Sequence, residues 1–304
     1  MLSYTCAEAT RERKETVMLW EEILSGDFEK AVEESKGVCA IVVGCVEHHG
    51  KHLPLGQDVI HGMEIAKRAA EKEPVVIFPP QYFGEKQGAG EFKGTIIFSS
   101  KLIFDILTET CDEIGRNGFK KIVIISSHGG NSSMLNNFAR STLYSKKDYS
   151  VVVYQASNAW PKVPEILSMV ESGRRDVFPD LLDSDIEFLK EYVENNTDRG
   201  HGCLMETAIT LGTRPELVDL SRVNNVSGSS THLFDHLSKA GFYSPHAWMA
   251  NYPNSLSSNY HDGNNERIAK SAVRFATDKM ASAFKLIKED TVLENYHNEW
   301  LKKQ

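Results

Sequence analysis

The sequence predicts an α/β protein with three layers, in which a mostly parallel sheet lies between two layers of helices. Apolar runs rich in β-branched residues, the usual composition of buried strands, occur near 38–46, 75–79, 121–127 and 150–154. Helical patterns fall between these runs, at about 59–72, 100–117 and 131–145. Strands that alternate with helices in this way are typical of a parallel sheet covered on both faces. Right-handed crossovers then bring the carboxyl ends of the strands to one edge.

The remainder of the chain is less regular, and we treat residues 1–304 as a single domain. Residues 12–36 predict one or two helices, and residues 264–303 return to a helical pattern. The acidic segment 160–199 is helical but interrupted by Pro and Gly, which indicates a helical insertion. A hairpin over the site and a helix pair for subunit contacts fit this insertion equally. Residues 222–263 are rich in Asn, Ser, His and Gly, which is typical of a binding loop or lid.

Composition excludes several classes of protein. The 304 residues carry a net charge of −8 without a long basic run, which argues against a nucleic-acid partner. Five cysteines without tight spacing favour reduced thiols and a cytoplasmic location over a disulfide framework. The first residues lack the apolar core of a signal peptide, and no stretch approaches the ~18 apolar residues that cross a bilayer. We therefore expect a small-molecule substrate and no membrane partner.

A cluster of acidic residues and histidines follows the first apolar run. Glu47 and His49 are two residues apart, so an extended backbone would point both toward one site. Asp58 comes just before a helix expected to start near residue 59, where it can cap that helix or bridge two cations. Carboxylate and imidazole together suit Zn, Mn or Fe. The alternative is a solvated polar loop with incidental histidines.

Two further polar segments favour a convergent site. His128 ends the third apolar run and precedes a Gly pair and Asn131, which we interpret as a helix cap rather than a substrate contact. His201 and Glu206 precede a short helical stretch. Three such segments on one chain predict side chains that gather at the strand ends.

These residues resemble the motifs of the creatininase (creatinine amidohydrolase) family. The resemblance covers roughly 36–155 and 200–290 and rests on Glu47-x-His49-Gly50 with His52-Leu53-Pro54-Leu55 and Asp58, on His128-Gly129-Gly130-Asn131, and on His201-Gly202-x-x-x-Glu206-Thr207. It implies a creatininase-like fold, a homo-oligomer (a hexamer in the family) and two divalent metal ions, Zn, Mn or Fe. It also implies a ligand set with Asp58 as the bridge: Glu47, His49, Asp58, His128 and Glu206.

The sequence departs from the family at two places. Creatininase itself carries a ligating Glu where this chain has Gly130, so Glu206 is the expected ligand instead. The family often places a His before the element that matches Phe92-x-Gly94-Thr95, and segment 84–92 of this chain contains none. Substrate contacts from that loop are therefore not expected to follow the family pattern.

His201 and Glu206 are the expected catalytic residues. His201 is the candidate general acid or base, and its alternative is a loop histidine bonded to backbone. His52 is either a hydrogen-bond partner of a ligand carboxylate or a packing residue. His48 is expected to point away from the ligands, and Cys203 is interpreted as a small buried thiol rather than a nucleophile.

The expected function is that of a metal-dependent hydrolase that opens a small cyclic amide or a related C–N bond. Two alternatives within the family are hydrolysis of a C–C bond in a cyclic keto-polyol and removal of formate from a formamide. A non-catalytic metal-binding protein is the alternative from another class. The glycines at 88–94 are spaced one residue too long for a dinucleotide loop, and no G-x-S-x-G element supplies a serine nucleophile.

Overall fold

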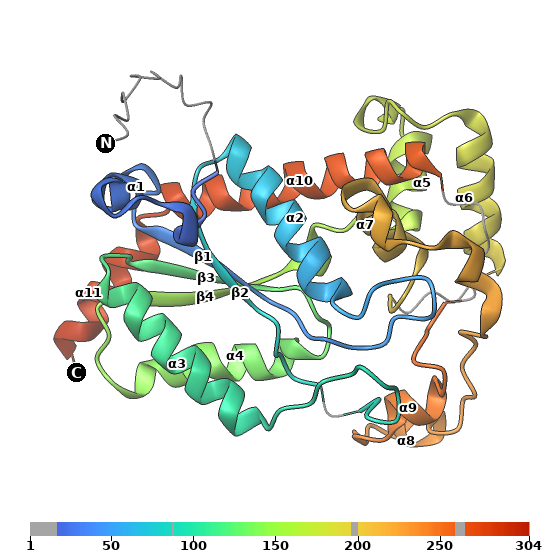
Figure 1. Cartoon of the computed structure of the whole chain (residues 1–304), viewed down its shortest axis with the longest axis horizontal. Helices are drawn as coiled ribbons and strands as arrows, with labels where there is room; N and C mark the ends of the chain where they lie inside the picture. The colour runs from blue at the N-terminus through green and yellow to red at the C-terminus, as the bar shows by residue number, and fades with distance from the viewer. Residues whose placement is uncertain (1–16, 87, 196–199, 259–264, 304) are drawn as a thin grey trace, which may run out of the picture.

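A computed structural model describes residues 17–86, 88–195, 200–258 and 265–303 (Figure 1). Its sheet has the strand order β2-β1-β3-β4, and every neighbouring pair is parallel. The strands lie close to their predicted positions: β1 (Val38–Val43), β2 (Val76–Gln81), β3 (Lys121–Ser126) and β4 (Ser150–Gln155). The predicted α/β class with a parallel sheet is confirmed.

The two central strands are buried along their whole length. All six residues of β1 and all six of β3 are buried, and they pair in register from Val38 with Lys121 to Val43 with Ser126. A strand covered on both faces needs apolar side chains at successive positions rather than at alternate ones. This is why both strands appear in the sequence as continuous apolar runs.

Helices cover both faces of the sheet, which gives the three predicted layers (Figure 1). On one face, Ala40 and Val42 belong to the same apolar cluster as residues of α2 (Gln57–Lys72), α7 (Leu204–Thr213) and α10 (Glu266–Glu289). On the other face, Cys39 and Ile41 pack with α3 (Ser100–Arg116) and α4 (Asn131–Ser141). Alternate side chains of one strand therefore supply two separate cores.

Three predicted helices have different bounds in the structure. The helix expected at 131–145 ends at Ser141 and continues as a 3-10 turn, η3 (Thr142–Tyr144), and the helix expected at 59–72 begins at Gln57. The described part of 12–36 contains η1 (Trp20–Glu22), η2 (Ser25–Asp27) and a short α1 (Phe28–Glu34). Extended residues at 23 and 24 interrupt the helical pattern there.

The predicted insertion forms α5 (Val163–Glu171), η5 (Arg175–Val177) and α6 (Asp183–Asn195). These elements are not a detached hairpin. Phe178, between them, stacks on Phe275 of α10 with ring centroids 5.5 Å apart, and Leu189 of α6 is fully buried in the same core. The end of the segment, residues 196–199, lies outside the described residues.

The segment 222–263 is irregular, as predicted, with η7 (Leu220–Asn225) at its start and the short helices α8 (Asp235–Lys239) and α9 (Ala247–Asn251). The last predicted helix is divided into α10 and α11 (Val292–Lys303). Two further 3-10 turns are η4 (Ala156–Asn158) and η6 (Pro215–Leu217). Within the described ranges, no helix is both long and apolar enough to cross a membrane.

Candidate metal centre

The five predicted ligands meet at the carboxyl edge of the sheet. Glu47 and His49 follow β1, and His128 follows β3. Asp58 and Glu206 lie in the first turns of α2 and α7. Their donor atoms fall into overlapping groups whose members lie within 4.8 Å of one another: Cys45 with Glu47, Asp58 and His128; Glu47 with His49 and His201; and His49 with Asp58 and Glu206.

Asp58 stands between two histidines. Its Oδ1 lies 3.2 Å from Nε2 of His49, and its Oδ2 lies 3.1 Å from Nδ1 of His128. Each oxygen therefore faces a different group of donor atoms, which is the arrangement that a bridging carboxylate needs. The predicted position of Asp58 before the helix is wrong, because it lies inside α2 and the N-cap residue, Gly56, makes no side-chain capping bond.

The histidine His49 presents one ring nitrogen to the cluster. Its Nδ1 donates to the backbone carbonyl of Glu47 over 3.2 Å, so Nε2 is left facing Asp58. This Nε2 is buried and forms no hydrogen bond with any described residue. A buried polar atom without a partner is costly, and metal-binding histidines are commonly held in this way by a bond from the other ring nitrogen.

The electrostatics of the cluster favour bound positive charge. Burial alone would raise the pKa of Glu47, but the neighbouring His128, His201 and His49 together outweigh it and hold that pKa well below its ordinary range. Burial also opposes protonation of the histidines, yet Asp58 raises the pKa of His49 to about 9, and Glu47 raises that of His128 to about 10. The buried carboxylates thus stabilise positive charge on the neighbouring histidines. Divalent cations bound among the same side chains would be stabilised in the same way.

Glu206 joins the same cluster from α7. Its Oε2 accepts a hydrogen bond of 2.7 Å from the backbone N–H of Gly202, and burial raises its pKa to about 8. In the turn that follows β3, a Cβ added at Gly130 would lie only 2.5 Å from Nε2 of His128. A larger residue at 130 would therefore displace the His128 ring.

His201 lies beside the cluster rather than within the predicted ligand set. Its Nε2 donates to the backbone carbonyl of His48 over 3.0 Å and lies 3.9 Å from Oε2 of Glu47. Its ring centroid is 4.2 Å from that of His49. Burial lowers the pKa of His201 to about 4, so the ring is neutral near pH 7. His201 therefore lies close to the site, as a general acid or base would. It also forms the hydrogen bond to backbone that the alternative interpretation predicts.

Lys86 is a member of the site that sequence reasoning missed. Its ammonium group is buried and lies 2.5 Å from Oε2 of Glu47. Segment 84–92 had been interpreted only as a loop lacking the family's His. No sequence signal indicated Lys86: its loop packs tightly against the end of β1, where a Cβ added at Gly84 would meet the backbone oxygen of Gly44 at 2.3 Å.

Cys45 is the second missed residue. Its thiol donates to Oδ2 of Asp58 over 3.0 Å and to Oε1 of Glu47 over 3.3 Å, and it is fully buried. From the sequence it was counted only among reduced thiols. Its signal was its place two residues before Glu47, on the same alternation that relates Glu47 to His49.

Several smaller predictions are corrected. Asn131 does not cap α4, because Gly130 is the N-cap residue and the Asn131 amide joins Glu85 N–H and the Val43 carbonyl instead. Of the two alternatives for His52, its hydrogen bond of 3.0 Å to Thr207 favours a structural role over a bond to a ligand carboxylate.

Other smaller predictions are confirmed. His48 stacks on the ring of Phe92 with centroids 4.5 Å apart, away from the ligands. Cys203 is a buried thiol, and it caps α7 by accepting from the Glu206 N–H.

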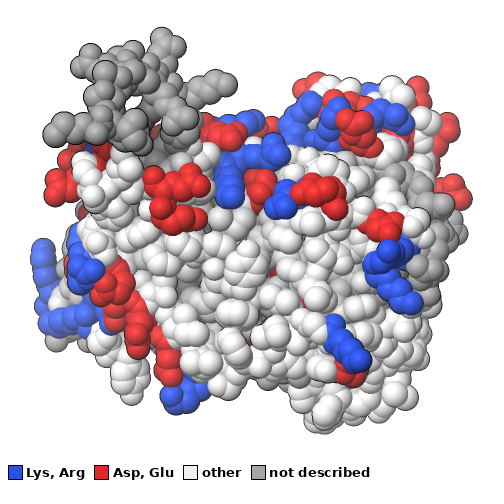
Figure 2. Space-filling view, viewed as in Figure 1, with Lys and Arg blue, Asp and Glu red and all other residues white. Residues whose placement is uncertain are grey.

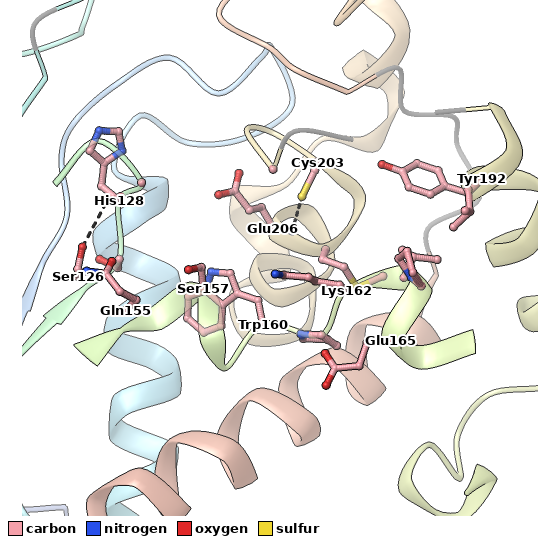
Figure 3. A pocket seen from close by; sticks show the side chains of 18 residues that line it. Ser126, His128, Gln155, Ser157, Trp160, Lys162, Glu165, Tyr192, Cys203 and Glu206 are labelled. Carbon is pink, nitrogen blue, oxygen red and sulfur yellow. Dashed lines mark hydrogen bonds between the residues drawn. The ribbon is translucent and has the colours of Figure 1, made fainter. Parts of the chain in front are cut away.

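Two cavities adjoin the cluster and share His128 and Glu206 among their lining residues. One, of about 800 Å³, extends toward α5 and α6, with Trp160 and Tyr192 in its wall; Figure 3 shows His128 and Tyr192 at its opposite sides. The other, of about 850 Å³, contains Lys86, His201 and Trp248. Trp160 and Trp248 therefore line different cavities.

Comparison with known proteins identifies the family. The model of the family described as "Creatininase: Creatinine amidohydrolase" matches residues 21–284. The chain belongs to the creatininase family. A creatinine amidohydrolase of Pseudomonas putida is 26% identical over 208 residues, which is 65% of this chain and 72% of that protein. The predicted membership in this family of metal-dependent hydrolases is thus confirmed.

Solved creatininases share the fold. One described as the manganese form has a TM-score of 0.66 at 20% sequence identity, covering 90% of this chain and all (100%) of that one. A mutant described as the zinc–zinc type has a TM-score of 0.64 at 20% identity, with the same coverage of 90% and 100%. The predicted creatininase-like architecture is confirmed.

Proposed function

We propose that this chain hydrolyses a small cyclic amide, or a related C–N bond, with two divalent metal ions held by Glu47, His49, Asp58, His128 and Glu206. The observation that carries this proposal is the position of Asp58, whose two carboxylate oxygens face His49 and His128 separately. Glu47, Asp58 and His128 would hold one ion, and His49, Asp58 and Glu206 the other. Zn, Mn and Fe all suit such donors, and relatives of this fold are described with manganese and with zinc.

Bound ions at such a centre supply an activated water and polarise the carbonyl that it attacks. The chain's own residues supply the rest. Glu206 is anchored by the Gly202 N–H, so its carboxylate has a fixed orientation. His201 is neutral near pH 7 because burial lowers its pKa to about 4, so we assign to it the uptake of the proton that the attacking water releases and the delivery of that proton to the leaving nitrogen. Trp248 packs edge-on to His201 with ring centroids 5.7 Å apart, which holds that imidazole in place.

A second substrate class is favoured by one specific observation. The cavity that contains Lys86 is also lined by Ser100, Ser133 and Asn137. Hydroxyl and amide groups beside a buried ammonium suit a ring that carries several hydroxyls and a ketone. Hydrolysis of a C–C bond in a cyclic keto-polyol is therefore the alternative reaction at the same centre, and a formamide is the third.

A substrate screen of the metal-reconstituted protein tests these assignments. Purified chain, stripped with chelator and reloaded with Zn, Mn or Fe, would be assayed with creatinine and other lactams, with formamides and with keto-inositols. We expect a ring-opened amide as product, and turnover reduced roughly 10²–10⁴-fold in His201→Ala, the usual range for a general acid. Turnover of keto-inositols alone would replace the first assignment with the second. No turnover of any class with any of these ions would reject a hydrolytic role.

We also propose that the protein works in the cytoplasm as a homo-oligomer without a nucleic-acid partner. The described cysteines are buried and form no disulfide with one another, which suits a reducing compartment: Cys39, Cys45, Cys111 and Cys203. Acidic and basic side chains are interspersed on the face in Figure 2, and no basic tract runs across its described part. The hexamer implied by the family resemblance is the assembly that we propose.

A further inference from the structure

Cys45 occupies a place in the cluster that the proposed ligand set does not use. Cys45, Glu47 and His49 lie at alternate positions after β1, and all three side chains reach the same group of donor atoms. The thiol is fully buried, as is Glu47. The three residues thus follow the alternation of an extended segment that directs every second side chain to one side.

The spacing of the donor atoms matches a single coordination sphere. Ligand atoms about 2.0–2.3 Å from a metal, at about 90–110° from one another, are separated by roughly 2.8–3.5 Å. The Cys45 sulfur lies 3.0 Å from Oδ2 of Asp58 and 3.3 Å from Oε1 of Glu47. Nδ1 of His128 lies 3.1 Å and 2.9 Å from the same two oxygens. Sulfur and nitrogen therefore flank the same pair of oxygens at ligand-like distances.

An independent observation also indicates a ligand at this cluster. Nε2 of His49 is buried and lies 3.2 Å from Oδ1 of Asp58 without forming a hydrogen bond to any described residue. This nitrogen faces the second ion position, so it supports the metal centre as a whole rather than Cys45 itself. A cation would satisfy the nitrogen and the carboxylate together.

We propose that Cys45 is a fourth protein ligand of the metal ion held by Glu47, Asp58 and His128. The inference rests on the proposed metal centre and adds a donor to it. The S–H bond breaks as the sulfur–metal bond forms, and the proton leaves to solvent. The hydrogen bonds that the thiol now donates to Asp58 and Glu47 are replaced by shared coordination of one ion.

A thiolate ligand changes which metal the site prefers. Soft sulfur donors favour zinc and other late transition metals, whereas sites made only of carboxylate and imidazole also accept Mn²⁺ and Mg²⁺. The position that includes Cys45 should therefore prefer zinc to manganese. The position formed by His49, Asp58 and Glu206 has only nitrogen and oxygen donors. The two positions would differ in metal preference.

Cobalt substitution tests the inference without relying on activity. The chelator-stripped protein would be titrated with Co²⁺ and followed by absorption in the visible and near-ultraviolet. We expect the wild type to develop the thiolate-to-cobalt charge-transfer band as the first ion binds. Cys45→Ser should still bind cobalt but lack that band, and Cys111→Ser, which removes a buried thiol on α3, should keep it.

The outcomes separate this inference from the proposed function. Cobalt bound with visible bands but without the charge-transfer band in wild type would overturn ligation by Cys45 and leave the metal centre intact. Failure to bind cobalt at all would overturn both. Competition between Zn²⁺ and Mn²⁺, measured by metal analysis, gives a second readout. Cys45→Ser should lower the preference for zinc by at least about 10-fold, the least that is typical for loss of a partner in a metal site, and an unchanged preference would contradict the inference.

Discussion

Asp58 is the residue on which both metal positions depend, since its two oxygens face different histidines. We expect Asp58→Ala to lose most of both ions. His52→Ala should retain both, because His52 bonds Thr207 and no predicted ligand. Metal analysis of the two variants, purified in parallel without chelator, measures the difference. Equal metal content would mean that Asp58 is not a bridge.

Lys86 balances the charge of Glu47 inside the protein, with both side chains almost fully buried. Breaking such a pair from one side typically costs about 3–5 kcal/mol, because the remaining charge is left buried. We therefore expect Lys86→Met to lower the free energy of unfolding of the metal-free protein by about that amount. Zinc should remove most of the loss, since a cation would then balance Glu47.

The matched control for this prediction is Lys162→Met, which removes an exposed lysine that lines the other cavity. Surface changes of this kind are usually within about 0.5 kcal/mol. Chemical denaturation of each variant, with and without zinc, would measure the effect. A zinc-independent loss in Lys86→Met would show that Lys86 supports packing rather than charge.

The site residues that the sequence predicted are those that stand near other possible metal ligands in the chain. Glu47, His49 and Asp58 stand close together after an apolar run, so their convergence needs only one strand and one turn. Lys86 reaches Glu47 from a different loop, 39 positions along the chain, and a lysine among glycines is otherwise typical of a solvated loop. Only tertiary packing could place it in the site.

The turn between β3 and α4 fixes the orientation of His128. Gly130 has helical backbone angles, φ −63° and ψ −22°, so alanine fits its backbone. An added Cβ would nevertheless lie 2.5 Å from Nε2 of His128, whereas a Cβ at Gly129 meets nothing within 4 Å. We expect Gly130→Ala to weaken metal binding by more than about 10-fold, and Gly129→Ala to leave it unchanged. Calorimetric zinc titration would compare them, and equal affinities would refute the steric argument.

The α6 and α10 helices are joined by Asp185. Its carboxylate accepts from Arg267 at 2.7 and 2.8 Å and from Asn265 at 2.8 Å, and the Arg267 hydrogen bonds lower its pKa below the ordinary value. A lowered folded-state pKa means that this contribution is complete above the unfolded pKa of about 4 and is lost as pH falls through the folded value.

We therefore expect Asp185→Asn to lower the free energy of unfolding by about 1.5–3 kcal/mol near pH 7, the range for hydrogen bonds to a charged group. The difference from wild type should shrink as pH falls below about 4. Urea unfolding at a series of pH values would measure this. A difference that stays constant down to pH 2 would mean that the carboxylate charge is not the cause.

Sequence patterns predicted the strands that are buried along their whole length. They predicted less well the segments whose conformation depends on contacts with distant parts of the chain. The fully buried β1 and β3 were evident from continuous apolar runs. The N-terminal segment was predicted as helix, but Trp20 packs edge-on against Phe28 and Phe78, and these aromatic contacts accompany short 3-10 turns instead. The predicted insertion contributes Phe178 and Leu189 to the main core, which its acidic composition did not indicate.

At the scale of the whole molecule, the centre lies where the two apolar cores meet at the sheet edge. Strand β1 contributes alternate residues to both cores and then delivers Glu47 and His49. Helices α2 and α7 contribute Asp58 and Glu206 from the layer on one face (Figure 1). Because every ligand stands at the end of a core element, the metal centre and the fold are expected to be lost together on unfolding.

Six large apolar side chains between residues 82 and 106 are each more than a third exposed: Tyr82, Phe83, Ile96, Ile97, Leu102 and Ile106. Exposed apolar side chains that form one patch often mark a protein interface, and we expect these six to contribute to the proposed homo-oligomer. Light scattering after size exclusion should give a mass well above the 34.1 kDa of one chain.

The double variant Leu102→Lys/Ile106→Lys changes two exposed positions one turn apart on α3, and it should shift the mass toward 34.1 kDa. Tyr144→Lys, at a site 98% exposed, should leave the mass unchanged. A wild-type mass of a single chain would exclude the assembly, and an unshifted double variant would place the interface elsewhere.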